Sequence, residues 1–279
     1  MNPAPPAAPS GRLAFIGGGN MARSLIGALV RSGGDASRIA VAEPNADLRK
    51  ALAHDFGVEV HTQARAAAEG ADTIVLAVKP QVLAAVCAEV AEVVRAQRPL
   101  LISIAAGIRI AQIQAWLGGE FAIVRAMPNT PALIGAGASG MIANAAANAQ
   151  QRASAEAILG AAGSTAWISR EELMDTVTAL SGSGPAYFFL LVEALEDAAV
   201  AQGLPRETAR ALATQTCLGA GRMLVEDGEA PTVLRGRVTS PGGTTAAALD
   251  AFAAGGLREL VSAAVAAATR RGRELSNPS

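Results

Sequence analysis

The chain has 279 residues, of which 51% are hydrophobic and 17% are charged, and its formal net charge is −1. This length and composition indicate a globular protein that is large enough for two domains. The near-zero net charge excludes the broad basic surface that binding to nucleic acid or anionic lipid needs. Cys87 and Cys217 lack metal-ligand or CxxC spacing, and we expect buried thiols in a reducing compartment.

The first ten residues are rich in Pro and Ala and lack the basic and apolar regions of a signal peptide. They predict a loose tail. Elsewhere, charges or glycines interrupt every apolar stretch before it reaches the length of a membrane span. We therefore expect a cytoplasmic protein without a membrane helix or a metal site.

A glycine-rich turn follows the first apolar run, Leu13–Ile16, and precedes a helix-compatible stretch. A strand, a tight turn and a helix start in this order are typical of a dinucleotide site. Gly17 would allow the sharp turn, Gly19 would let the backbone approach a pyrophosphate, and Ala22 would let the helix pack closely. The free N–H groups at the helix start would bind the phosphates. An ordinary tight turn is the alternative.

Strand and helix patterns alternate over the first part of the chain, which predicts a doubly wound parallel sheet of the α/β class. The expected strands span residues 13–16, 38–42, 58–61, 72–78, 100–104 and 122–125. The helices between them are expected at 46–54, 64–70, 83–95, around Trp116, and at 149–162. Residues 135–141 and 166–169 are expected to form further strands at the edge of the sheet.

Two charged residues follow strands whose carboxyl ends should face a ligand in such a sheet. Glu43 ends the second strand, where an acidic residue usually binds the hydroxyls of the adenosine ribose; a solvated turn residue is the alternative. Lys79 follows the fully apolar strand 72–78 and should face the cofactor. The small residues Ala105 and Ala106 after the next strand leave room for a flat ring.

From Glu171 onward the pattern changes to long helices rich in Ala, Leu and Val. They are expected at 173–180, 185–202, 206–224, 230–235, 244–252 and 257–274. Several are apolar nearly all round, which indicates a subunit interface. Two loops, residues 181–185 and 239–245, offer backbone N–H groups and hydroxyls at a helix start, as an anion site would. Simple helix capping is the alternative for each loop.

The helical part contains neither histidine nor lysine. Dehydrogenases that act on alcohols usually need such a base to take the proton of the hydroxyl group. Its absence favours a substrate whose reduction needs little from a protein acid. A cyclic imine fits, because it protonates readily in water and then accepts hydride.

Six blocks, in this order, resemble the pyrroline-5-carboxylate reductase family, and the resemblance extends over the chain from Arg12. The blocks are FIGGGNMA (15–22), AVKPQ (77–81), SIAAG (103–107), RAMPNTPA (125–132), LSGSGPAY (180–187) and VTSPGGTT (238–245). The resemblance implies a Rossmann domain over residues 11–168 and a helical dimerisation and substrate domain over 169–279. It also implies hydride transfer from NADPH or NADH to C5 of Δ1-pyrroline-5-carboxylate, which gives L-proline.

The resemblance further implies the site residues, with an active site completed across the interface of a homodimer that could belong to a larger ring of dimers. Thr245 would hydrogen-bond the ring nitrogen of the substrate as the catalytic residue. Ser240, Gly242 and Gly243 would bind the substrate carboxylate, with Glu171 nearby. The cofactor would contact Ile16, Gly17, Gly18, Gly19, Asn20, Met21, Ala77, Val78, Lys79, Pro80, Ile104, Ala105 and Ala106. We also expect cofactor contacts from Glu43, because of its place after the second strand, and from Asn129.

Two departures from the family pattern affect the choice of cofactor. Where the family often has small polar residues suited to a 2′-phosphate, this chain has Glu43, and Ala64 replaces an asparagine of the adenosine side. Arg65 beside it could offset the charge of Glu43 by pairing with the phosphate, so we expect use of both NADP and NAD. A β-hydroxyacid dehydrogenase and a non-catalytic dinucleotide-binding module are the alternatives; the first would need a lysine in the helical domain.

Overall fold

The computed structural model describes residues 11–276, so the expected tail over Met1–Ser10 lies outside the described residues. The described chain divides into two compact units. We call residues 11–183 with 268–276 the sheet unit and residues 184–267 the helical unit. The functional boundary expected at residue 168 stays a prediction.

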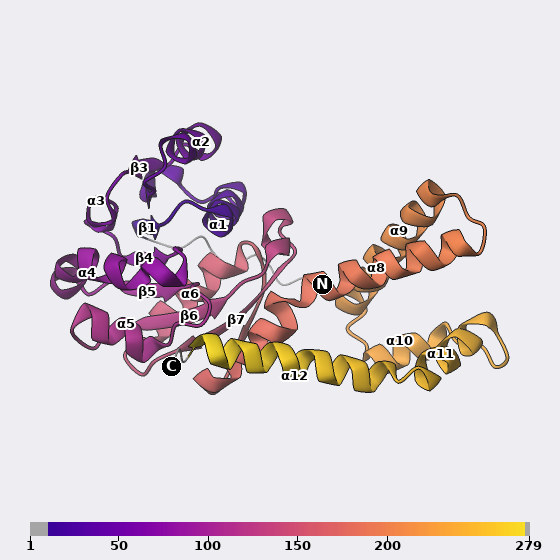
Figure 1. The fold of residues 1–279 in the computed structure, drawn as a ribbon. Coiled ribbons are helices and arrows are strands. Elements are labelled where there is room, and N and C mark those ends of the chain that lie inside the picture. The colour runs from indigo at the N-terminus through magenta and orange to yellow at the C-terminus, as the bar shows by residue number, and fades with distance from the viewer. Residues whose placement is uncertain (1–10, 277–279) are drawn as a thin grey trace. The chain divides into compact units, whose positions relative to one another are not determined.

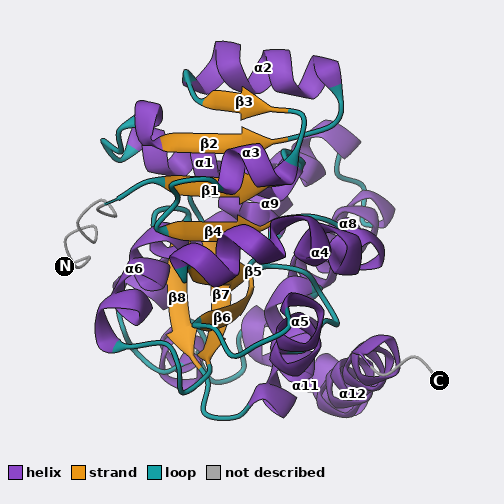
Figure 2. Ribbon diagram, turned by 90° about the vertical axis from the view of Figure 1, so that its left-hand side faces the viewer, coloured by secondary structure: helices purple, strands orange, loops and turns teal. Residues whose placement is uncertain are grey.

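One eight-stranded sheet organises the sheet unit, in the order β3-β2-β1-β4-β5-β6-β7-β8 (Figure 2). The strands are β1 (Leu13–Ile16), β2 (Ile39–Ala42), β3 (Glu59–His61), β4 (Thr73–Leu76), β5 (Leu100–Ser103), β6 (Ile123–Met127), β7 (Gly137–Ala143) and β8 (Gly163–Trp167). All neighbours run parallel except β6 and β7. The order of the first six strands is that of a Rossmann sheet, which confirms the predicted fold class.

Helices cover both faces of this sheet, as Figure 2 shows. They are α1 (Asn20–Arg31), α2 (Ala46–Phe56), α3 (Ala64–Ala68), α4 (Pro80–Gln97), α5 (Ile110–Leu117) and α6 (Ala149–Gly160). One buried cluster includes Leu25 of α1 and Ile158 of α6, and the other includes Leu83 of α4 and Ile113 of α5. Strands covered in this way are apolar on both sides, which explains the continuous apolar runs in the sequence.

The carboxyl ends of four parallel strands lie in line. Ile16 at the end of β1 pairs with Ala42 of β2 and with Leu76 of β4, and Leu76 pairs with Ser103 of β5. The segments that follow these four strands therefore begin at one edge of the sheet. Ligands of open α/β sheets bind at such an edge.

The last two strands differ in place from the prediction. Residues 135–141 were expected at an edge, but β7 lies inside the sheet between β6 and β8. The outermost strand β8 begins at Gly163, before the expected residues 166–169. The residues Gly163-Ser164-Thr165 have little intrinsic preference for a strand. They form one because they pair with β7.

Helices α8 to α11 and most of α12 make up the helical unit, coloured orange to yellow in Figure 1. Short helical turns precede it: η3 (Glu171–Leu173), α7 (Met174–Val177) and a π turn over Thr178–Gly182. The long helices are α8 (Gly184–Ala201), α9 (Arg206–Glu226), α10 (Pro231–Arg237), α11 (Thr244–Ala254) and α12 (Leu257–Ser276). Other short helical turns are η1 (Ala36–Arg38) and η2 (Thr130–Ile134).

A carboxylate joins α8 to α9. Glu196 of α8 accepts hydrogen bonds from Arg206 at 2.9 Å and from Arg210 Nε at 3.0 Å, both on α9. These bonds hold the pKa of the Glu196 carboxyl below its ordinary value. The ion pairs fix the two helices against each other at one end of the hairpin.

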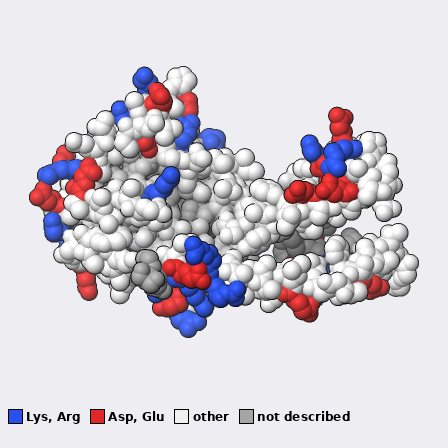
Figure 3. Space-filling view, viewed as in Figure 1, with Lys and Arg blue, Asp and Glu red and all other residues white. Residues whose placement is uncertain are grey.

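Apolar side chains of the helical unit are exposed along its helices, and the face seen in Figure 3 is largely uncharged. On α8, Phe188, Phe189 and Leu190 are each at least 60% exposed. Exposed apolar area of this extent indicates a protein–protein interface. Within the described residues, no single helix is long and apolar enough to cross a membrane; the bent pair α11 and α12 passes only when taken together, on length and composition.

Candidate functional site

The glycine-rich turn connects β1 to α1 at the aligned edge of the sheet. Gly17 has a φ of +103°, and a Cβ atom there would lie 2.6 Å from the carbonyl oxygen of Ala77. Both facts require glycine at this position. Gly19 precedes the first residue of α1, and a Cβ atom there would meet nothing within 4 Å. The helix start thus has no side-chain cap and faces open space, which suits a phosphate group.

Glu43 lies beside this turn and is only 8% exposed, so it is not a solvated turn residue. Its Oε2 accepts a hydrogen bond from the backbone N–H of Gly18 at 2.9 Å. Its Oε1 accepts one from the backbone N–H of Asn45, also at 2.9 Å. The carboxylate is therefore held at the end of β2 by two backbone donors, one of them from the glycine-rich turn.

The segments after β4 and β5 supply the next part of the same edge. Ala77 and Val78 are half-buried, and Pro80 begins α4. Lys79 is exposed and occupies the N-cap position of α4, where its charge adds to the positive end of the helix dipole. After β5, Ile104 is half-buried, Ala105 is buried and Ala106 is exposed. Small side chains and one cation thus border the ends of these two strands.

Asn129, predicted on the cofactor side, is buried after β6. Its side-chain oxygen accepts a hydrogen bond from the backbone N–H of Ala138 at 2.9 Å. Its side-chain nitrogen donates to the carbonyl oxygen of Ser181 at 3.0 Å, in the π turn before α8. In the structure the Asn129 amide therefore joins two segments of the sheet unit, and its contact with a cofactor stays a prediction.

Glu171, predicted near the substrate, also has two partners in the sheet unit. Its Oε1 accepts hydrogen bonds from Arg125 Nη1 at 3.0 Å and from the backbone N–H of Ile110 at 2.9 Å. Arg125 is only 3% exposed. This pair was not predicted from the sequence, although an arginine inside the apolar strand β6 signals that a carboxylate must accompany it.

The predicted substrate loop lies in the helical unit, between α10 and α11. The N–H of Gly243 donates to the carbonyl oxygen of Ser240 at 3.1 Å and closes a turn in which Gly242 has a φ of +70°. Gly243 is the N-cap of α11, so no side chain caps this helix. Thr245 is half-buried in the first turn. Within the described chain its hydroxyl makes no hydrogen bond, so it does not act as a cap here.

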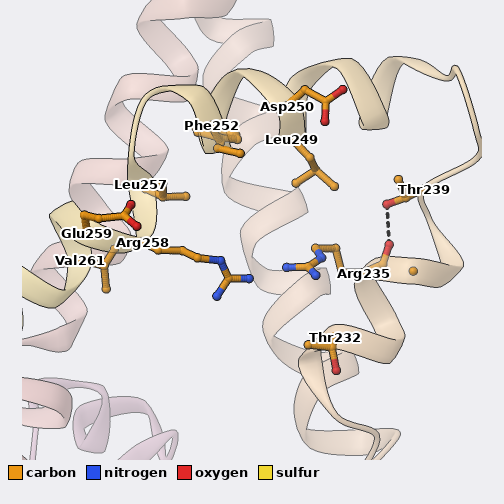
Figure 4. A pocket seen from close by; sticks show the side chains of 12 residues that line it. Thr232, Arg235, Thr239, Leu249, Asp250, Phe252, Leu257, Arg258, Glu259 and Val261 are labelled. Atoms are coloured by element: carbon orange, nitrogen blue, oxygen red, sulfur yellow. Dashed lines mark hydrogen bonds between the residues drawn. The ribbon is translucent and has the colours of Figure 1, made fainter.

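A pocket of about 1000 Å³ lies in the helical unit close to this loop in sequence. In Figure 4, Arg235 of α10 and Arg258 of α12 extend into it toward each other. The hydroxyl of Thr239 donates to the carbonyl oxygen of Arg235 at 2.6 Å and fixes the end of α10. Leu249, Phe252 and Leu257 supply its apolar wall.

Two family models match the chain. The model described as pyrroline-5-carboxylate reductase dimerisation matches residues 171–275. The model described as NADP oxidoreductase, coenzyme F420-dependent, matches residues 12–107. The first match includes the loop before α11, and the second includes the glycine-rich turn, Glu43 and the segments after β4 and β5.

Relatives along nearly the whole chain share one name. The chain is 48% identical to pyrroline-5-carboxylate reductase of Pseudomonas aeruginosa over 95% of its own length and 97% of the relative's. It is 43% identical to that of Synechocystis, over 95% and 98% of the two chains.

Two solved structures of the same name share its fold. The pyrroline-5-carboxylate reductase of Coxiella burnetii has a TM-score of 0.94 and 44% identity, over 96% of this chain and 99% of that one. The Plasmodium falciparum pyrroline carboxylate reductase with NADP bound has a TM-score of 0.83 and 29% identity, over 97% and 100% of the two chains. The resemblance expected from the sequence is confirmed: this chain belongs to the pyrroline-5-carboxylate reductase family.

Proposed function

We propose that this oxidoreductase reduces the C=N bond of Δ1-pyrroline-5-carboxylate by hydride transfer from NADH or NADPH and forms L-proline, the last step of proline biosynthesis. The observation that carries the proposal is the aligned edge of the sheet, where β1, β4 and β5 end together next to an uncapped helix start. Membership of the family supports the choice of reaction.

The cofactor fits this edge. The open space at Gly19 and the free N–H groups of the first turn of α1 suit the pyrophosphate. We assign the adenosine ribose to Glu43 and the nicotinamide half to the segments 77–80 and 104–106, whose small side chains leave room for a flat ring. A bound reduced nicotinamide supplies the hydride. Ile16 to Met21 and Asn129 complete the proposed cofactor set.

We assign the substrate to the loop before α11. Its carboxylate would accept hydrogen bonds from the backbone N–H groups of Gly242 and Gly243 and from Ser240, at a helix start that no side chain caps. The Thr245 hydroxyl, unbonded within the described residues, would then bond the ring nitrogen of the imine. It orients the ring for attack at C5 and relays a proton to or from the nitrogen. Glu171 stays a proposed neighbour of the substrate.

The chemistry suits a site without histidine or lysine on the substrate side. The imine nitrogen gains a proton from water before hydride arrives, and the resulting iminium carbon accepts the hydride pair. The nitrogen loses its positive charge and becomes the amine of proline. A hydroxyl partner is sufficient for this change, whereas reduction of a ketone needs a protein acid to protonate the alkoxide.

We also propose that the chain works as a homodimer, with a ring of dimers as the larger assembly. The exposed apolar residues of α8 and the match to a dimerisation model support the dimer. An obligate interface of this kind buries more than ~2,000 Å². Light scattering of dilute, active enzyme should give the mass of a dimer or a multiple of it, and a fully active monomer would overturn the proposal.

We also propose a role for each of the two domains and a cellular location for the protein. Residues 11–168 would bind the dinucleotide, and residues 169–279 would bind the substrate and the partner subunit. We propose a cytoplasmic location, supported by the free thiols of Cys87 and Cys217.

The test of the function is an assay of purified enzyme with each reduced cofactor. Oxidation of NADH or NADPH should depend on pyrroline-5-carboxylate and should yield proline in equal amount. A β-hydroxyacid with the oxidised cofactor is the control for the alternative dehydrogenase, and it should give no reaction. Turnover of the hydroxyacid, or none of the imine, would refute the proposed activity.

A further inference from the structure

The carboxylate of Glu43 is fixed in the position where a dinucleotide would place its adenosine ribose. Both of its oxygens accept backbone hydrogen bonds, from Gly18 and from Asn45, and the residue is 8% exposed. The N–H of Glu43 itself donates to the carbonyl oxygen of His61 at 3.0 Å. The backbone N–H and both carboxylate oxygens of Glu43 are thus hydrogen-bonded. The carboxylate cannot move away without breaking its two bonds.

Each carboxylate oxygen can accept a second hydrogen bond, because it has two lone pairs and uses one. The two hydroxyls of an unmodified ribose are donors and match this acceptor. A 2′-phosphate carries negative charge and has no proton to donate at neutral pH. Beside a buried carboxylate it would meet like-charge repulsion that nearby water screens poorly.

The cation expected to offset this repulsion is engaged elsewhere. Arg65 lies on α3, where Nη1 is 2.8 Å from Oε2 of Glu92 and Nε is 3.6 Å from Oε1 of Glu69. Moving its guanidinium to a phosphate would break two ion pairs. The sequence-based expectation that Arg65 balances Glu43 therefore lacks support in the structure.

A second cation, Arg49 of α2, lies close to Glu43 but is turned to the backbone. Its Nη1 donates to the carbonyl oxygens of Glu43 and Pro44, each at 2.7 Å. In this position it fixes the turn after β2. Lys50 is exposed on the same helix and forms no ion pair within the described residues. Arg49 and Lys50 are the cations of α2 with which a 2′-phosphate would have to pair once the charge of Glu43 is removed.

We propose that Glu43 makes this enzyme prefer NADH to NADPH, by accepting hydrogen bonds from the adenosine ribose while excluding a 2′-phosphate. The proposal rests on the proposed function, since it assumes that a nicotinamide dinucleotide binds at the glycine-rich turn. It goes further, because it selects one of the two cofactors and assigns the selection to one residue.

Direct binding tests the proposal without turnover. Calorimetric titration of the wild-type enzyme with NADH and with NADPH gives the ratio of the two dissociation constants. We expect NADH to bind at least about tenfold more tightly, as a repulsion between neighbouring charges in a partly buried site implies. The Glu43→Ser variant should lower this ratio at least about tenfold, since the repulsion between the carboxylate and the 2′-phosphate is then absent.

Two further variants make the result specific. Glu43→Gln keeps the size and one acceptor of the side chain, so it should shift the ratio toward NADPH even if Glu43→Ser does not fold. Asp47→Asn removes an exposed charge four positions along the chain and should leave the ratio unchanged. Equal or tighter binding of NADPH by the wild type would overturn the NADH preference and leave the proposed function intact. Failure of both nucleotides to bind would instead refute the proposed function.

Discussion

Arg125 and Glu171 form an ion pair inside the sheet unit, with Arg125 Nη1 3.0 Å from Glu171 Oε1. Glu171 also accepts the backbone N–H of Ile110, the first residue of α5. The pair therefore connects β6, η3 and the start of α5. Because Arg125 is only 3% exposed, its charge would lose its carboxylate partner in a poorly hydrated site if Glu171 were removed.

Replacing Glu171 should therefore destabilise the fold. We expect Glu171→Ala to lower the free energy of unfolding by about 3–5 kcal/mol, the usual cost of leaving a buried charge unpaired. Denaturant titration measures this change, and Glu172→Ala on the neighbouring residue is the control, expected within about 0.5 kcal/mol of wild type. An unchanged unfolding free energy with a raised KM for the imine would instead favour the predicted role of Glu171 beside the substrate.

The glycine-rich turn allows a comparison of two substitutions with opposite consequences. Gly17→Ala places a Cβ atom 2.6 Å from a carbonyl oxygen at a φ of +103°, so it should cost about 1–3 kcal/mol of stability. Gly19→Ala meets nothing within 4 Å at an ordinary φ of −69°, so the fold should tolerate it. Its methyl group would occupy the space proposed for the pyrophosphate.

Thermal unfolding and cofactor titration separate the two effects. Gly19→Ala should weaken cofactor binding by about tenfold or more, equivalent to ~1.4 kcal/mol, at a nearly unchanged Tm. Normal cofactor affinity in Gly19→Ala would show that the open space at this helix start does not receive the phosphates.

Local sequence pattern predicted much of this fold because its central strands are short and fully apolar. β1 and β4 stand in the sequence as continuous apolar runs. Gly and Pro residues mark the ends of the elements between them, so the helices there could be predicted. The π turn over Thr178–Gly182 was instead predicted as the end of one helix over 173–180. Its carbonyl at Ser181 is bonded by Asn129, a contact between residues 52 positions apart that no local pattern contains.

The candidate site likewise has features that the local sequence predicted and features that it did not. The turn at Gly17 was predictable, because strand, glycines and helix stand next to one another in sequence. The hydrogen bond from Gly18 to Glu43 was not predictable, since the two residues are 25 positions apart in sequence. The ion pair of Arg65 with Glu92 depends on the packing of α3 against α4, so the sequence did not predict it, and the pairing of Arg65 with a phosphate stays a prediction.

The thiol of Cys87 should make stability depend on pH. Cys87 is fully buried on α4, and burial raises the pKa of its thiol from 9.0 to about 11. The unfolded thiol ionises first, so the stabilisation is complete below pH 9 and is lost as the pH rises toward 11. The loss should be about 2 kcal/mol.

Denaturant titrations across this pH range, compared with Cys87→Ala, measure that loss. The variant should lack the part of the slope that Cys87 causes. Identical slopes in both proteins would show that the thiol ionises as readily folded as unfolded.

Substitutions at Thr245 test whether its hydroxyl takes part in catalysis. Thr245→Ala should lower kcat by about 10- to 1,000-fold if its hydroxyl bonds the reacting nitrogen. Thr245→Ser keeps the hydroxyl and should retain most activity. Thr244→Ala, on the exposed neighbouring residue of α11, is the control and should leave kcat nearly unchanged. A near-normal kcat with a lowered Tm in Thr245→Ala would identify a structural role instead.

Isotopic labelling follows the proposed transfer of hydride from the cofactor to C5 of the imine. Reduced cofactor deuterated at the transferable C4 position is incubated with the enzyme and pyrroline-5-carboxylate, and the proline is examined by mass spectrometry and NMR. Direct transfer should give one deuterium per proline, located at C5. Proline without deuterium, or with deuterium at another carbon, would contradict it.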